Sequence, residues 1–171
     1  DERLCRELLS SPKDLLEHRF VVDAIDAALA PHTRILTAEP APGILRLAHA
    51  QHLVTRFEGR IGEGVTDGDL LAALHPTPAV GGQPREAALD EIEAAEPFDR
   101  GWYAGPVGWI GRDKAQFVVG IRSALVDGLR LHLYSGAGIV ADSDPAEEWE
   151  EIENKIRDYL EVLAAYEPNN I

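Results

Sequence analysis

Two pairs of carboxylates stand three residues apart in segments with helical periodicity. Asp14 and Glu17 form one pair near the start of the chain, and Glu148 and Glu151 form the other near its end. Residues three apart on a helix share a face, so each pair can present its oxygens together. Oxygen ligands without clustered cysteine or histidine are what a hard cation such as Mg²⁺ prefers. The same spacing is common on solvated helix faces, and spacing alone leaves both interpretations open.

The segment GAGIVA, residues 136–141, matches the glycine-rich nucleotide fingerprint G-x-G-x-x-[GA]. A dinucleotide fold needs these glycines to close a strand and open a helix directly, within a parallel βαβ unit. Here V-A-D-S-D-P separates the glycines from the helix, and the nearby carboxylates would repel a pyrophosphate. The pattern therefore argues against a dinucleotide site. Gly136 and Gly138 still leave bare backbone N–H groups that could receive a carboxylate.

Two basic side chains complement these features. Arg122 is expected in the middle of a strand over 116–125, where a core-facing position is normally apolar, and Lys155 follows Glu151 by one helical turn. With the glycine backbone, they would suit an anionic substrate whose carboxylates lie beside a magnesium ion. For Arg122, an ion pair on the surface of an edge strand is the alternative.

Two polar rings lie in apolar surroundings. His52, in AQHLVT, falls in an alternating strand pattern, where a lone histidine is more typical of a hydrogen-bonded core residue than of a catalytic one. Tyr103, in GWYAGPVGW, is suited either to hydrogen-bond a ligand or to pack. The pattern alone assigns neither ring a role.

Periodicity predicts the elements that must position these residues. One or two helices are expected within 1–31, with Ser11-Pro12 as the start of the second, and further helices at 69–74, 85–95 and about 145–166, the last capped by Ser143 or Asp144. Strands are expected at 33–37, within 44–61, and at 102–110, 116–125 and 129–134. A V-D-G hairpin turn joins the last two strands, and 75–84 is expected to be irregular. Short turns between sequential strands predict an α+β fold, an antiparallel sheet flanked by helices, in a single unit over 1–171.

Composition narrows the class of protein. The net charge of −14, from 30 acidic and 16 basic residues, argues against nucleic acid or an anionic membrane surface as a partner. No apolar run approaches the roughly 18 residues of a membrane span. The single cysteine, Cys5, excludes an internal disulfide framework and fits a reducing compartment, so a cytoplasmic location is expected. Because the chain starts at Asp1 and enters helical periodicity at once, we expect it to be part of something longer.

Six segments in order resemble the C-terminal part of the chorismate-binding enzymes. They are SPKDLLEHRFVVDAI (11–25), QHLVT (51–55), HPTPAVGGQP (75–84), FDRGWYAGPVGW (98–109), GIRSAL (120–125) and YSGAGIVADSDPAEEWEEIENK (134–155). That family includes isochorismate synthases, salicylate synthases, and the large subunits of anthranilate and aminodeoxychorismate synthases. The resemblance covers most of the chain. It implies the C-terminal part of an anthranilate synthase component I-like fold, with the N-terminal half of that fold absent.

The resemblance also implies a magnesium site. Glu17 and Glu151 would be direct ligands of Mg²⁺, with Asp14 and Glu148 nearby through water. The family often has glutamate at the position of Asp14, so this shorter side chain is a small departure.

The other candidate residues would surround chorismate. His52 would lie close to the substrate's ring, as the candidate catalytic residue of this chain. Tyr103 and Arg122 would bind one substrate carboxylate. Lys155, together with magnesium and the backbone of Gly136 and Gly138, would bind the other.

One loop indicates the subfamily. Members that eliminate pyruvate or install an amine typically carry threonine at the position of Ala79. Ala79 and Val80, in HPTPAVGG, resemble isochorismate synthases, which isomerise chorismate without lysing it. The implied activity is a magnesium-dependent conversion of chorismate to isochorismate, which would feed menaquinone or siderophore synthesis. Salicylate synthase and anthranilate synthase component I are the alternatives within the family.

The chain departs from the family in lacking its general base and acid. These are a lysine and a glutamate from the half that precedes the six motifs, and Lys13 and Lys114 stand in other contexts. We therefore expect a C-terminal fragment: a truncation, a proteolytic product or half of a split enzyme. Its partners would be chorismate, isochorismate and the missing half or another copy of the chain. The alternative is a non-catalytic fragment that binds substrate and metal.

Overall fold

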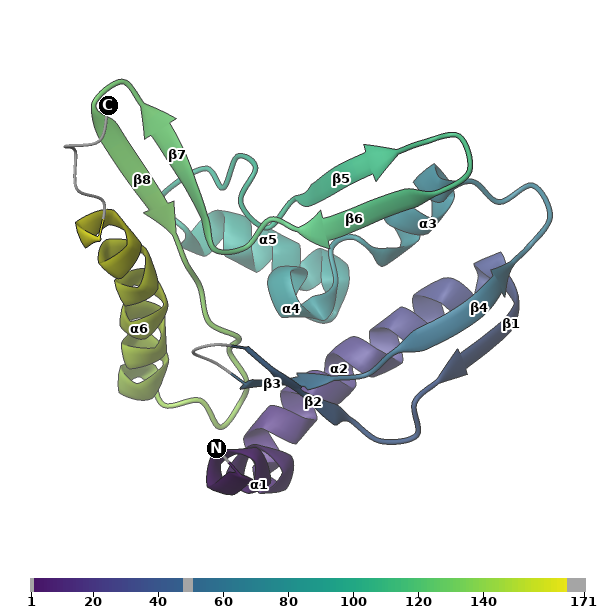
Figure 1. Ribbon diagram of the computed structural model, residues 1–171, viewed down its shortest axis with the longest axis horizontal. Helices are drawn as coiled ribbons and strands as arrows, with labels where there is room; N and C mark the ends of the chain where they lie inside the picture. Colours follow the sequence, from purple (N-terminus) through teal and green to yellow (C-terminus); the bar gives the residue numbers. More distant parts are fainter. Residues whose placement is uncertain (1, 48–50, 166–171) are drawn as a thin grey trace. The chain divides into compact units, whose positions relative to one another are not determined.

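A computed structural model gives the fold and describes residues 2–47 and 51–165 (Figure 1). The contacts of the chain fall into two compact units, residues 1–97 and residues 98–171. Unit 1 carries Asp14, Glu17, His52 and Ala79. The other candidate residues belong to unit 2.

The helices of unit 1 follow the expected boundaries closely. They are α1 (Glu2–Ser10), α2 (Pro12–Leu29), a 3₁₀ turn (Ala30–His32), α3 (Asp67–Leu74), α4 (Pro78–Gly81) and α5 (Arg85–Ala95). Helix α2 begins as predicted, because the side chain of Ser11 accepts a hydrogen bond from the backbone N–H of Asp14 and proline occupies the first turn. The expectation that 75–84 is wholly irregular is wrong, since α4 forms one turn there with proline at its start.

The strands of unit 1 form a long interrupted ribbon. They are β1 (Thr33–Ala38), β2 (Gly43–Arg46), β3 (Gln51–Val54) and β4 (Phe57–Ile61). Strand β1 pairs antiparallel with β4, and β2 pairs antiparallel with β3 between them. At the interruption the backbone N–H of Glu39 donates to the carbonyl of Arg56, and the two side chains form an ion pair at 2.9 Å. His52 pairs with Leu45, next to the last pair of β2 and β3, which is Arg46 with Gln51.

Unit 2 consists of two hairpins and a long helix. The elements are β5 (Pro106–Ile110), β6 (Ala115–Val119), β7 (Ser123–Asp127), β8 (Arg130–Tyr134) and α6 (Pro145–Ala164). Strands β5 and β6 pair antiparallel, as do β7 and β8, whose turn at Gly128 (φ +59°) is the predicted V-D-G turn. With helices beside antiparallel pairs, the predicted α+β class is confirmed.

Two expected strands of unit 2 have other boundaries. The strand expected over 116–125 is broken at residues 120–122, because the N–H of Ile121 turns back to the carbonyl of Val119 at 2.8 Å. The strand expected from residue 102 begins only at Pro106, since residues 101–104 form turns in which the N–H of Tyr103 donates to the carbonyl of Arg100. Arg122 therefore lies between strands and not in the middle of one.

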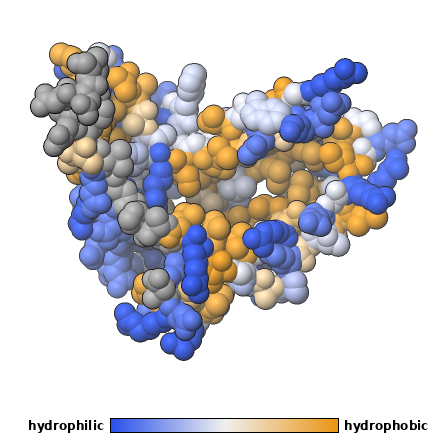
Figure 2. Space-filling view, viewed as in Figure 1, coloured by the Kyte–Doolittle hydropathy of each residue, from blue (hydrophilic) through white to orange (hydrophobic). Residues whose placement is uncertain are grey.

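Both units leave much apolar surface open (Figure 2). Among the described residues, no large side chain is completely buried, and Cys5 and Ala104 are the most buried apolar ones. Trp102 is 92% exposed and Val126 71% exposed. None of the helices in the described part of the chain is long and apolar enough to cross a membrane.

Candidate functional site

The acidic pair of unit 1 lies in the first two turns of α2. Asp14 and Glu17 are both half-buried, and Oε1 of Glu17 is shielded from solvent. Removing a carboxylate from water is costly unless a cation or hydrogen-bond donors compensate. A shielded oxygen beside a second carboxylate fits a cation ligand better than it fits a fully solvated helix face.

A histidine that the sequence did not single out attaches this part of α2 to the ribbon. The Nε2 atom of His18 lies 2.7 Å from Oγ1 of Thr55, just past the end of β3. Burial lowers the pKa of His18, which favours the neutral ring. Sequence reasoning missed His18, although it directly follows Glu17 in DLLEHRF. Its bond to Thr55 connects the helix of Glu17 to the strand of His52.

His52 itself is exposed on β3, opposite Leu45. The interpretation of His52 as a core residue is therefore wrong, because this face of the ribbon is open within unit 1. Its neighbour Gln51 accepts a hydrogen bond from the thiol of Cys5 at 2.9 Å, which attaches α1 to the same strand. An exposed imidazole is available to a ligand, and its expected place beside the substrate's ring stays a prediction.

The loop that carries Ala79 is shaped by close backbone packing. Ala79 lies on α4 with its methyl group exposed. At the end of this helix Gly82 has φ +71°, and a Cβ there would lie 2.6 Å from the Cβ of Ala88. The guanidinium of Arg85 donates to the carbonyl of His75 and closes the loop. Burial, and to a lesser extent the charge of Arg85, lower the pKa of His75.

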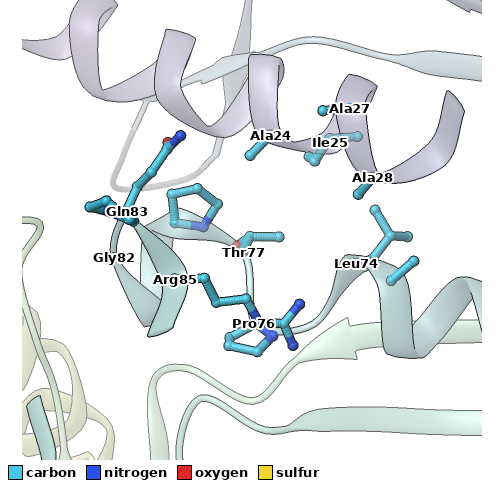
Figure 3. Close-up of a pocket in the computed structure, with 13 residues that line it drawn as sticks. Ala24, Ile25, Ala27, Ala28, Leu74, Pro76, Thr77, Gly82, Gln83 and Arg85 are labelled. Atoms are coloured by element: carbon cyan, nitrogen blue, oxygen red, sulfur yellow. The ribbon is translucent and has the colours of Figure 1, made fainter. Parts of the chain in front are cut away.

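An apolar cavity of about 400 Å³ lies between this loop and α2 (Figure 3). Ala24 and Ala28 line it from α2, and Leu74, Pro76 and Thr77 line it from the other side. Ala79 is not among its lining residues. The side chain of Ala79, the residue that indicates the subfamily, therefore does not face this cavity.

In unit 2, backbone hydrogen bonds bring Tyr103 and Arg122 to the same end of the β5–β6 hairpin. The N–H of Ala104 donates to the carbonyl of Gly120 at 3.0 Å, and the N–H of Gly120 donates to the carbonyl of Gly105 at 2.7 Å. Ala104 and Arg122 both have left-handed backbones, with φ of +61° and +51°. Residues other than glycine rarely adopt this backbone conformation, and those that do are concentrated at functional sites. The local strain supports a functional role for this end of the hairpin.

The ring of Tyr103 is held between other side chains and the glycine segment. It stacks on Tyr134 with ring centroids 5.4 Å apart and an interplanar angle of 18°, and the guanidinium carbon of Arg100 lies 5.8 Å from its centroid. Its hydroxyl lies so close to Gly136 that a Cβ added there would be 2.7 Å from the oxygen. The bare backbone of Gly136 is therefore needed to admit the tyrosine hydroxyl.

Helix α6 is capped by Asp144, whose Oδ1 accepts from the N–H groups of Ala146 and Glu147 at 2.9 and 3.1 Å. Of the two predicted caps, Asp144 is right. The hydroxyl of Ser143 instead accepts from the N–H of Val140 at 3.1 Å and closes the preceding turn. The cap lies four residues before Glu148, which therefore falls in the first turn and a half of the helix.

The acidic pair of α6 is divided between a buried and an exposed carboxylate. Glu148 is 3% exposed, whereas the side chain of Glu151 is 47% exposed and forms an ion pair with Lys155. The ammonium of Lys155 also donates to the carbonyl of Gly136 at 2.9 Å. Lys155 therefore connects the acidic face of α6 to the glycine segment. The two carboxylates offer oxygen atoms, which are the ligands that a hard cation prefers.

Unit 2 thus brings four predicted residues into one continuous group: Tyr103, Gly136, Lys155 and Glu151. Gly138, which is exposed, follows two residues after the half-buried Gly136. Within the described residues 2–47 and 51–165, no three carboxylate, histidine or cysteine side chains gather as a metal centre. The magnesium ligands therefore stay a prediction.

Comparisons with known proteins agree with the six motifs. The family model for the chorismate binding enzymes matches residues 1–164. The "Salicylate biosynthesis isochorismate synthase" of Pseudomonas aeruginosa is 48% identical over 96% of this chain, which covers 35% of that protein.

Two crystal structures share the fold. A putative 2,3-dihydroxybenzoate-specific isochorismate synthase from Bacillus anthracis aligns with a TM-score of 0.89 and 40% identity, over 97% of this chain and 45% of its own. Anthranilate synthase component I from Streptococcus pneumoniae aligns with a TM-score of 0.83 and 29% identity, over 91% of this chain and 36% of its own. The 171 residues thus span between about a third and a half of these relatives. The chain belongs to the chorismate-binding enzyme family, and its match is to part of that fold.

Proposed function

We propose that the protein carrying this chain is a magnesium-dependent isochorismate synthase, and that this chain supplies most of the groups that hold chorismate. The observation that carries the proposal is the continuous contact from Tyr103 through Gly136 and Lys155 to Glu151. It places a phenol, a bare backbone, an ammonium and a carboxylate together within one unit. Identity is higher to isochorismate synthases than to the anthranilate synthase component, which supports this choice of reaction.

One substrate carboxylate would be bound by Tyr103 and Arg122. The phenolic hydroxyl can donate to an anionic oxygen, and the guanidinium offers a planar pair of donors. The hydrogen bonds between Ala104, Gly105 and Gly120 hold the two residues at one end of a hairpin. Preset donors lose little conformational freedom when the carboxylate binds.

The second substrate carboxylate would lie at the glycine segment. Lys155 supplies positive charge there while its ammonium holds the carbonyl of Gly136. The backbone N–H groups around Gly136 and Gly138 can then face an anion without side chains in the way.

Magnesium would be held directly by Glu17 and Glu151, with Asp14 and Glu148 acting through water. When bound, the ion would neutralise and anchor the second carboxylate. The shielded oxygens of Glu17 and Glu148 support this donor set.

The reaction itself moves a hydroxyl group between ring carbons. Water adds at one carbon as hydroxide leaves another and the double bonds shift, so substrate and product have the same composition. A lysine base and a glutamate acid are expected from a part of the protein outside these residues. His52, exposed on β3, would lie beside the ring.

Ala79 favours isomerisation over loss of pyruvate. Its methyl group offers no hydroxyl to the substrate, and it stands where lyase and aminating members of the family typically carry threonine. We therefore expect isochorismate as the product.

The direct test is to incubate the protein, at its natural length, with chorismate and Mg²⁺ and to measure isochorismate and pyruvate. We expect isochorismate, no pyruvate, and loss of turnover with a chelator. Pyruvate as the main product would refute the proposal that Ala79 favours isomerisation. Turnover that is unaffected by a chelator would refute the requirement for magnesium.

The same assay on the 171-residue chain alone separates an enzyme from a binding fragment. We expect chorismate binding without turnover, because the base and acid lie elsewhere. Turnover by this chain would show that both groups are within it.

A further inference from the structure

We propose that Tyr134 is a positioning residue: its ring holds the hydroxyl of Tyr103 against the backbone of Gly136, where that hydroxyl would meet the substrate. This inference rests on the proposed function, since it deepens the role of Tyr103. The comparisons and the family resemblance assign no role to Tyr134.

The aromatic contacts carry the first step. Tyr134 is the last residue of β8, and its ring stacks on Tyr103 at 5.4 Å and 18°. Phe98 contacts Tyr134 at 6.4 Å with a tilt of 58°. Both geometries are favourable for aromatic pairs, and each contributes beyond the area it buries. Tyr134 is thus the middle member of a three-ring row that begins at Phe98 and ends at Tyr103.

The glycine clearance carries the second step. A Cβ at Gly136 would lie 2.7 Å from the hydroxyl of Tyr103 but 3.9 Å from the ring carbon that bears it. Only the hydroxyl therefore comes closer to this backbone than ordinary contact. Tyr134 and Gly136 are two residues apart, so one short segment provides both the surface on which Tyr103 stacks and the surface its hydroxyl meets.

The consequence concerns substrate affinity. The ring of Tyr103 sits on a turn, residues 101–104, and a turn alone does not set the angle of a side chain. The stack fixes that angle, and with it the direction of the donor. Without Tyr134, the Tyr103 ring can rotate away, and the substrate carboxylate loses a preset hydrogen bond.

The test is a double-mutant cycle on the protein at its natural length, with KM for chorismate as the readout. Tyr103→Phe removes the hydroxyl and is expected to raise KM about tenfold. Tyr134→Leu removes the stack and is expected to raise KM about threefold to tenfold, whereas Tyr134→Phe keeps the ring and restores most of the affinity. In the Tyr103→Phe background, Tyr134→Leu is expected to add almost nothing, because its effect acts through the missing hydroxyl.

A second cycle uses the glycine. Gly136→Ala is expected to raise KM by displacing the hydroxyl, and Tyr103→Phe is expected to remove that penalty, since the added methyl then meets only the ring at ordinary distance. Trp109→Leu is the matched control. It deletes an aromatic ring of the same unit that contacts Lys114, and we expect KM to stay unchanged.

The outcomes separate the two proposals. If Tyr103→Phe leaves KM unchanged, the proposed role of Tyr103 is wrong. If Tyr103→Phe raises KM but the effect of Tyr134→Leu simply adds to it, or Tyr134→Phe is as impaired as Tyr134→Leu, the positioning role is wrong while the proposed function stands. Melting curves of each variant identify any that lose affinity by unfolding, and the Gly136→Ala cycle then decides.

Discussion

The two acidic helix faces have the same spacing but different surroundings. On α2 both carboxylates are half-buried, and burial lowers the pKa of the next residue, His18. On α6 one carboxylate is buried at 3% exposure, and the other forms an ion pair with Lys155. The same i, i+3 spacing thus occurs with two half-buried carboxylates on α2, and with one buried and one ion-paired carboxylate on α6. One turn beyond the pair, α2 carries Val21 and α6 carries Lys155.

The largest expected effect comes from neutralising a direct ligand on each helix. Glu17→Gln and Glu151→Gln should each lower magnesium-dependent turnover at least about a hundredfold, because the ion loses an anionic oxygen. Activity against magnesium concentration measures this, with melting temperature as the check on folding. Glu150→Gln, an exposed neighbour on α6, is the control and should behave as wild type.

If Glu151→Gln and Glu150→Gln depend on magnesium equally, Glu151 is not a magnesium ligand and belongs to a solvated helix face. A loss in Glu151→Gln but none in Glu17→Gln would place the ion on α6 alone, and the comparison between the helices would then be one of function as well as of surroundings.

A smaller effect is expected from removing Lys155, the cation that pairs with Glu151 on α6. Lys155→Met keeps the length of the side chain but breaks both the bond to the carbonyl of Gly136 and the ion pair with Glu151. We expect KM for chorismate to rise about tenfold, since charged hydrogen bonds are stronger than neutral ones. Lys114→Met, which removes a cation from over the ring of Trp109, is the control. A KM that is the same in both variants would remove Lys155 from the site.

The helix caps provide a third comparison. Asp144 accepts two backbone N–H groups at the start of α6, whereas Ser11 accepts one at the start of α2. Replacing either by alanine should cost about 1 kcal/mol of the free energy of unfolding, with the larger loss for Asp144. Urea titration of each variant measures this. A larger loss of unfolding free energy in Ser11→Ala would show that the number of capping hydrogen bonds does not determine how much each cap stabilises the protein.

Helix caps and turn residues in the sequence correctly predicted where several elements begin and end. These signals depend only on residues close together in the sequence, and all three are found in the structure: Ser11-Pro12, Asp144-Pro145 and the V-D-G turn. The break at residues 120–122 was missed because backbone hydrogen bonds form it, from Ile121 to Val119 and between Gly120 and residues 104–105, and the apolar pattern does not reveal such bonds. A left-handed Arg122 leaves no trace in composition or periodicity.

The sequence named candidate residues for the site but gave no indication of the contacts between them. The resemblance supplied Tyr103, Gly136, Lys155 and Glu151, and the structure joins them. The resemblance included Tyr134 in the segment 134–155 but gave it no role. Its stacking depends on where β8 ends relative to a turn some thirty residues earlier, and strand patterns do not encode that distance.

The smallest expected effect is the pH dependence that His18 adds to the stability of the α2 region. Burial lowers the pKa of His18 below its ordinary 6.5, so the unfolded chain takes up the proton first as the pH falls. The free energy of unfolding should therefore be highest above pH 6.5 and decline as the pH falls from there through the lower pKa of the folded state. His18→Gln keeps a polar partner for Thr55 and should show a shallower decline, measured by urea titrations between about pH 5 and about pH 8. His75, whose pKa is also lowered, contributes in the same direction, so His75→Gln is the matched comparison and the double variant should be the flattest. A decline as steep in His18→Gln as in wild type would show that this ring does not couple α2 to the ribbon through its protonation.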